Sequence, residues 1–222
     1  RMVGTTVEIA RRTGIGQAIV GAVFVGISTS LSGTILSFYT AAQNHPELSV
    51  ANSIGGIAAQ TAFLAVADIL LRRANLEHAS ASLANLAQGA LLIILLAMPL
   101  AAMAVPAVTF FGIHPLTPLL VLVYFLGLRV VGTIKQTPMW HPKLTRDTEH
   151  DSRETGGHKT ASTSVLFITF GLNACLLIAA GLVVAESGIA IAARTGMSET
   201  AVGALFTAVS TSLPELVTAI AA

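Results

Sequence analysis

Charged residues are scarce in this chain of 222 residues: 10% are charged, whereas 54% are hydrophobic. Soluble domains carry about a quarter charged residues, so the composition excludes an ordinary soluble protein and indicates one that crosses a membrane several times. The single cysteine, Cys175, lies in an apolar run, so an intramolecular disulfide is excluded and we interpret this residue as a small buried hydrophobe. The sequence also lacks a Gly-rich phosphate loop and a haem-binding pair, and its histidines lie only at the ends of the apolar runs or in loops. We therefore expect neither an enzyme nor a nucleic-acid-binding protein.

Six apolar runs are each long enough to cross the hydrocarbon core of a bilayer, which takes about 20 residues. They are too long for strands and lack alternation, so all six are predicted to be membrane-spanning helices. The runs cover residues 15–41, 47–71, 81–105, 114–134, 162–186 and 198–222. The sequence begins with Arg1 instead of methionine and stops inside an apolar run, so we expect a fragment whose missing helices belong to the same parent protein.

Positive charges gather on one side of the membrane when the connecting loops are assigned to alternating sides. That side receives eleven of the twelve Lys and Arg residues, and only Arg194 falls on the other. Because cytoplasmic loops carry the excess of positive charge, the N-terminal segment and the 135–161 loop are predicted to be cytoplasmic. We therefore expect a multi-pass protein of the cell (inner) membrane, with the lipid bilayer as a partner.

The polar loop over residues 135–161 divides the chain into residues 1–134 and residues 162–222. It contains three histidines whose spacing fits no compact set of metal ligands: His141, His150 and His158. We interpret the loop as a solvated linker, and metal sensing is the alternative.

The two ends of the chain share an internal repeat at a constant offset of 182 residues, the separation of Ser28 from Ser210. Ser28-Thr29-Ser30-Leu31 matches Ser210-Thr211-Ser212-Leu213 in this register. The copies lie on the first and the sixth predicted helices, so they are expected to cross the membrane in opposite directions. Inverted repeats of this kind place the binding site of a transporter near the midplane, between the two halves.

The second copy continues into Pro214 and Glu215, in a segment otherwise as apolar as lipid. An ionisable residue there is costly and is a functional hypothesis by default. Pro214 lacks a backbone donor and is predicted to break the helix near the middle of the membrane. Thr211, Ser212 and Glu215 lie within one turn, so their oxygens can converge on a dehydrated cation. The alternative for the hydroxyls is bonding back to the helix, or packing as small side chains.

At these residues the chain resembles the cation/calcium exchanger superfamily, which includes sodium/calcium and calcium/proton exchangers. Members carry Gly-Thr-Ser-x-Pro-Glu on one helix and a companion motif with Gly-Asn and Gly-Ser-Asn on the next, which residues 51–60 match. The resemblance implies an all-α membrane bundle of ten helices in two inverted sets of five, six of them visible here. It also implies cation or proton ligands at six positions, of which Glu215 and Thr211 would hold a metal: Thr29, Ser30, Gln60, Thr211, Ser212 and Glu215.

The sequence departs from the family motif in the first copy of the repeat. Ser32 and Gly33 stand where the family has Pro-Glu, Gly56 replaces a serine, and Gln60 replaces the usual Asn or Asp. A divalent ion would lose much of its charge compensation with the missing carboxylate. Exchange of a monovalent cation for protons, with Glu215 as the shared site, is therefore favoured. Asn52 in the companion motif is expected to form a hydrogen bond between helices.

These features predict a secondary antiporter that exchanges sodium, calcium or another cation against protons or sodium. The transported cation would be its ligand, and no cofactor is expected. The alternative is a degenerate, non-transporting membrane subunit or sensor of the same fold, which the loss of Pro-Glu in the first copy favours.

Overall fold

The computed structural model of the chain describes residues 26, 28–70, 75–104, 109–110, 112–141, 143, 145 and 162–221. The regular elements in these residues are helices. They belong to two compact units, one formed by Arg1–Arg72 with Gly156–Ala222 and the other by Arg73–Thr155.

Five helices in the described part of the chain are long and apolar enough to cross a membrane. They are Pro46–Leu70, Leu83–Met103, Leu116–Gln136, Ser164–Thr195 and Glu199–Val217. These match five of the six predicted spans. In the part of the chain that the structure describes, they confirm the predicted all-helical fold with the character of a multi-pass membrane protein. The remaining span, predicted over residues 15–41, is described only from residue 26 and contains α3 (Leu31–Ala42).

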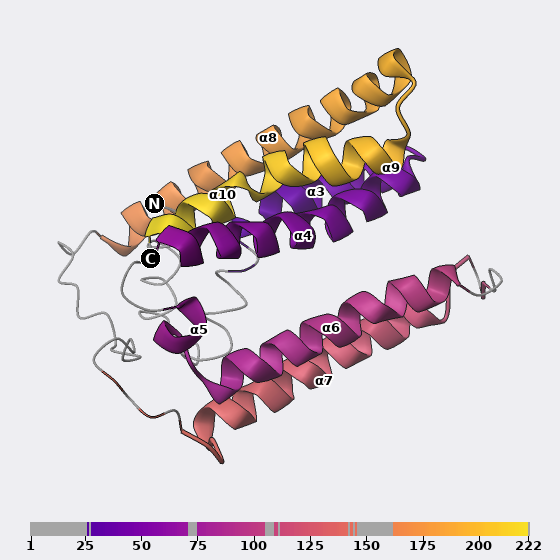
Figure 1. The fold of residues 1–222 in the computed structure, drawn as a ribbon. Coiled ribbons are helices and arrows are strands. Elements are labelled where there is room, and N and C mark those ends of the chain that lie inside the picture. The colour runs from indigo at the N-terminus through magenta and orange to yellow at the C-terminus, as the bar shows by residue number, and fades with distance from the viewer. Residues whose placement is uncertain are drawn as a thin grey trace. The chain divides into compact units, whose positions relative to one another are not determined.

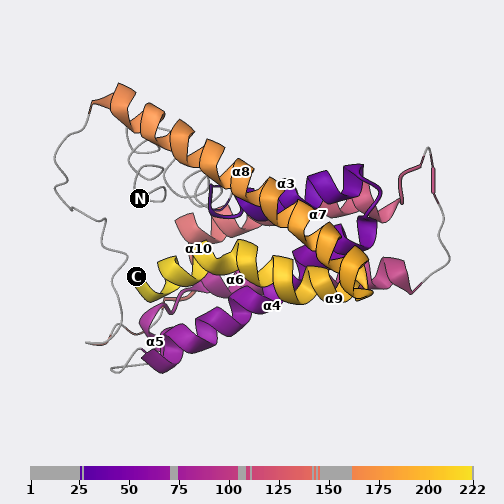
Figure 2. The same ribbon diagram turned by 90° about the horizontal axis from the view of Figure 1, so that it is seen from above.

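The first unit packs α3 against both α4 (Pro46–Leu70) and α8 (Thr163–Thr195). The last part of the chain packs along α4, as Figures 1 and 2 show. It consists of α9 (Glu199–Ala201), the π-helix η1 (Val202–Thr207) and α10 (Ala208–Ala221), in this order. The largest apolar side chains that are fully buried among the described residues of these helices are Leu36, Leu48 and Val202. This unit therefore contains the Ser-Thr-Ser segments of both repeat copies.

Glycines let the helices of the first unit approach to backbone distance. A Cβ added at Gly55 of α4 would lie 2.6 Å from the Cα of Ala204 in η1. A Cβ added at Gly181 of α8 would lie 2.6 Å from the carbonyl oxygen of Ser32 in α3. Van der Waals packing holds membrane helices together, and small residues allow the closest packing. These glycines therefore set the spacing between the helices.

Replacing Gly55 by alanine is expected to destabilise the protein. The added methyl group would meet the backbone of η1, which cannot move away as a flexible side chain does. Overpacking of this kind lowers the free energy of unfolding by about 1–3 kcal/mol. The midpoint of thermal unfolding in detergent should fall for Gly55→Ala. It should stay unchanged for Gly171→Ala in α8, where an added Cβ meets nothing within 4 Å, and equal midpoints would contradict the close approach.

The helix α8 is longer than the run predicted over residues 162–186, because it continues to Thr195. Its 33 residues extend about 50 Å at 1.5 Å per residue, more than the ~30 Å of a hydrocarbon core. The helix ends at Gly196, whose φ of 71° gives a left-handed C-cap. The length of an apolar run predicts the part of a helix that lies in the hydrocarbon core. The helix itself continues beyond that part until a C-cap residue, here Gly196, ends it.

Pro214 does not break its helix as predicted, because α10 continues through it to Ala221. The departure from α-helical geometry lies earlier, in the six π-helical residues of η1. A proline inside a membrane helix is tolerated when neighbouring groups and local adjustments satisfy the carbonyl that it leaves without a donor. The π-helix precedes the repeat residues in the same span, and such segments are frequent at functional sites.

The second unit contains α5 (Leu76–Ala79), α6 (Leu83–Met103) and α7 (Leu116–Gln136). The hydroxyl of Ser82 caps α6 by accepting from the backbone nitrogen of Asn85 at 3.0 Å. The helices α6 and α7 pack together, with Leu91 close to Gly127. The two compact units are defined by contacts between helices, so their bounds differ from those of the repeat halves expected over 1–134 and 162–222. That division stays a prediction, and most of the 135–161 linker lies outside the described residues.

Candidate functional site

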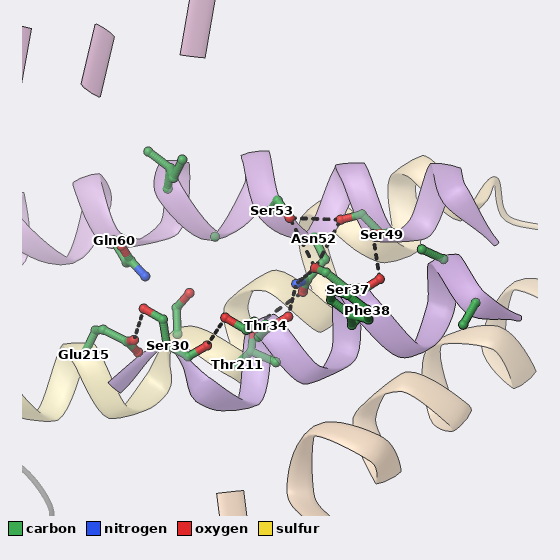
Figure 3. A pocket seen from close by; sticks show the side chains of 16 residues that line it. Ser30, Thr34, Ser37, Phe38, Ser49, Asn52, Ser53, Gln60, Thr211 and Glu215 are labelled. Carbon is green, nitrogen blue, oxygen red and sulfur yellow. Dashed lines mark hydrogen bonds between the residues drawn. The ribbon is translucent and has the colours of Figure 1, made fainter. Parts of the chain in front are cut away.

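A pocket of about 610 Å³ lies in the first unit, lined by α3, α4 and α10 (Figure 3). Hydroxyl, amide and apolar groups form most of its surface, and Glu215 is the one acidic or basic residue among the described residues that line it. The lining consists of Ser30, Gly33, Thr34, Ser37, Phe38, Ala41, Ala42, Ser49, Asn52, Ser53, Gly56, Ile57, Gln60, Thr211, Ser212 and Glu215.

The acidic end of the pocket joins both copies of the repeat. The hydroxyl of Ser30, from the first copy, donates to Oε1 of Glu215, from the second copy, at 3.5 Å. Gln60 extends from α4 toward these two side chains, as Figure 3 shows. Three helices thus bring a hydroxyl, an amide and a carboxylate to one end of the pocket.

Thr211 and Ser212 lie where α10 packs on α4, and both are almost fully buried. The Thr211 hydroxyl lies 2.9 Å from the carbonyl oxygen of Thr207 and 3.4 Å from Oδ1 of Asn52. The Ser212 hydroxyl faces Gly56, where an added Cβ would lie 3.5 Å from Oγ. A larger residue at position 56 would therefore fill the space beside Ser212.

The other end of the pocket carries a cluster of serine hydroxyls from α3 and α4. Ser49 Oγ donates to the carbonyl oxygen of Ser37 at 2.8 Å, and Ser53 Oγ donates to the carbonyl oxygen of Ser49 at 3.1 Å. The hydroxyls of Ser37 and Ser53 are 3.2 Å apart. Because hydrogens of this cluster bond to backbone carbonyls, oxygen lone pairs remain available to a further partner.

Five of the six predicted ligand residues line this pocket: Ser30, Gln60, Thr211, Ser212 and Glu215. Thr29 is not among the lining residues, and its hydroxyl donates to the carbonyl oxygen of Gly26 at 3.1 Å. Bonding back to the helix was the alternative for the repeat hydroxyls. Thr29 bonds in this way, and the Thr211 hydroxyl also has the carbonyl oxygens of Thr207 and Ala208 within reach. That the other five bind an ion stays a prediction.

Several polar residues of the pocket were not predicted as site residues. The sequence carries a signal for some of them, because Ser30, Thr34 and Ser37 recur at intervals of four and three and so share one face of a helix. Asn52 was expected only to bond between helices, which it does, and it also lines the pocket. The residues missed as site residues are Thr34, Ser37, Ser49, Asn52 and Ser53.

The described residues contain no group of three or more His, Cys, Asp or Glu side chains that could hold a metal ion. Calcium takes six to eight oxygen ligands, with carboxylates among them. In this pocket Glu215 and Thr211, the two predicted metal ligands, are accompanied by neutral hydroxyls and amides. A weakly charged oxygen-lined pocket suits a monovalent cation better than a divalent one.

The contacts between α3 and α10 also define the relative direction of the two helices. Ser30 contacts Glu215, while Ser32 Oγ donates to the carbonyl oxygen of Thr211 at 3.5 Å. Residue numbers therefore rise along α3 as they fall along α10, and the two helices run in opposite directions.

Residues 1–132 match the model of one protein family, which is described as sodium/calcium exchanger protein. The match includes α3, α4 and the pocket residues on them, whereas α10 lies beyond it. No match to the chain is found among curated proteins or among solved structures.

Proposed function

The chain belongs to the sodium/calcium exchanger protein family, and from this premise we propose that it exchanges a cation across the membrane through the pocket between α3, α4 and α10. The contact of Ser30 with Glu215 carries the proposal. It brings Glu215, the one carboxylate among the described lining residues, to a hydroxyl of the other repeat copy, within helices of membrane-spanning character. The family match confirms the resemblance read from the repeat motifs, and transport is what this family has in common.

The two repeat copies form an inverted pair in this proposal. The opposite directions of α3 and α10 support it, and so does the contact between the two Ser-Thr-Ser segments. In transporters with inverted repeats, the site lies near the midplane, where the halves meet. The complete bundle would then contain ten helices in two sets of five.

The coupling follows from the chemistry of Glu215. A carboxylate can hold a cation or a proton but not both, so the two ions exclude each other and exchange becomes possible. With Gly33 in place of a second carboxylate, the pocket compensates one positive charge. We therefore assign a monovalent cation such as Na⁺ as the transported ion and protons as the coupling ion, with calcium as the alternative.

The proposed location is the cell (inner) membrane, with the N-terminal segment and the 135–161 loop in the cytoplasm. Its support is the distribution of Lys and Arg, of which Arg194 alone falls on the other side. In this orientation the turn between α3 and α4 faces outward, and the serine end of the pocket lies nearer to it than Glu215 does.

The full-length protein in liposomes that contain a trapped pH dye tests the proposed exchange. We expect addition of Na⁺ or K⁺ outside to release protons from the lumen, because the cation displaces the proton from Glu215. Calcium is expected to give a smaller response, since one carboxylate compensates only half of its charge.

Absence of proton flux with every cation, from protein shown to be folded, would contradict proton exchange. A sodium-dependent uptake of labelled calcium in that case would favour the calcium alternative. If neither proton flux nor calcium uptake is detected, the result would favour the alternative of a non-transporting subunit of the same fold.

A further inference from the structure

Asn52 lies in the middle of α4 and connects it to both helices that carry the repeat. Its side chain is 3% exposed. Nδ2 donates to the carbonyl oxygen of Gly33 at 3.4 Å and to the hydroxyl of Ser37 at 3.1 Å, both on α3. Oδ1 accepts from the hydroxyl of Thr207 at 2.9 Å and from that of Thr211 at 3.4 Å. One amide thus bonds to three further helical segments.

The orientation of this amide follows from its partners. A backbone carbonyl can only accept, so the end of the side chain that faces Gly33 must be the NH₂ group. The end that faces Thr207 and Thr211 is then the oxygen, toward which both hydroxyls can donate. The Thr207 hydroxyl also lies 3.0 Å from the carbonyl oxygen of Gly203. Thr211 also has the carbonyl oxygens of Thr207 and Ala208 within reach. Whichever acceptor takes its hydrogen, the lone pairs of the Thr211 oxygen remain available to a cation.

We propose that Asn52 and Thr207 form a positioning pair that holds the Thr211 oxygen as a cation acceptor in the pocket. The inference rests on the proposed function, because it assigns a role within the same site. Thr207 is the informative member of the pair, since it is 2% exposed and is not among the lining residues. The backbone carbonyl oxygen of Thr207 contacts the Thr211 hydroxyl directly, but the side-chain hydroxyl of Thr207 reaches the pocket only through Asn52.

The location of Thr207 explains how the helix provides this contact. Thr207 is the last residue of the π-helix η1 and Thr211 follows one turn later in α10. Both hydroxyls thereby lie against the same amide oxygen. The methyl group of Thr207 lies on the other side against Gly188 of α8, where an added Cβ would be 2.8 Å from Cγ2. This packing holds the Thr207 side chain with its hydroxyl toward Asn52. The π-helix sets the position of Thr207 along the span, so that its hydroxyl and that of Thr211 face the same amide oxygen.

Replacing Thr207 by valine tests the pair, because valine keeps the shape and removes the hydroxyl. Equilibrium binding of radiolabelled Na⁺ and Ca²⁺ to the purified full-length protein gives the cation affinity directly. We expect the Kd of the bound cation to rise about tenfold in Thr207→Val, as one hydrogen bond in the network is lost. Thr207→Ser keeps the hydroxyl and removes only the methyl group, so its Kd should lie closer to that of the wild type than to that of Thr207→Val.

A double-mutant cycle separates positioning from stability. In Asn52→Leu, which removes the amide, the further change Thr207→Val should leave the Kd unchanged if the two residues act as a pair. A Thr207→Val protein that melts at a lower temperature but binds with wild-type affinity would overturn the positioning role and leave the proposed exchange intact. A wild type that binds neither cation would overturn the proposed function and this inference together.

Discussion

Replacing Glu215 by glutamine is expected to abolish cation-coupled proton flux while leaving membrane insertion and folding intact. Glutamine has nearly the same size and can still accept from the Ser30 hydroxyl, which lies 3.5 Å from Oε1. It carries no charge and does not bind and release a proton in the physiological range, so neither ion is held. Since Glu215 is the one carboxylate among the described lining residues, nothing in them can take over its role.

Glu47→Gln is the matched control for this measurement. Glu47 is exposed in the first turn of α4 and does not line the pocket, so the same change of charge should leave the flux unchanged. Both variants are compared in liposomes at equal amounts of folded protein. Undiminished exchange by Glu215→Gln would refute the assignment of Glu215 as the shared site.

Replacing Gly33 by glutamate is expected to raise the affinity for calcium by about a hundredfold, equivalent to ~3 kcal/mol. Gly33 stands at the position that matches Glu215 in the other repeat copy. A Cβ added there would lie 3.5 Å from Thr211 Oγ1 and 3.8 Å from Asn52 Nδ2, which are ordinary contact distances. The pocket therefore accommodates a Cβ at position 33 without a steric clash. A second carboxylate there would compensate the second charge of calcium.

Gly33→Gln separates the effect of charge from that of size. Glutamine fills the same volume without a charge, so its calcium affinity should stay near that of the wild type. Binding of radiolabelled calcium to purified protein measures both variants. Equal affinities in Gly33→Glu and Gly33→Gln would mean that position 33 does not correspond to the carboxylate of the second copy.

The sequence alone predicted the membrane helices and most of the candidate site. Apolar runs of about 20 residues have few alternatives to a spanning helix, and the described residues form helices of spanning length in five of the six predicted spans. The Ser-Thr-Ser repeat and Glu215 stand out because polar groups are costly in such runs. The family resemblance followed from the same residues, and the match over residues 1–132 bears it out.

The tertiary structure decided which polar side chains share the pocket. Thr29 and Ser30 are neighbours, and the sequence predicted both as cation ligands. Of the two, Ser30 lines the pocket and Thr29 does not, because successive residues of a helix point about 100° apart. The serines of α3 and α4 meet because these two helices pack against each other, whereas glycines such as Gly55 and Gly181 fix the spacing of α4 against η1 and of α8 against α3. The sequence therefore determined the elements and the charge at the site, whereas the rotation and spacing of the helices determined its lining. Those two quantities depend on contacts between residues far apart in the chain, which no local pattern records.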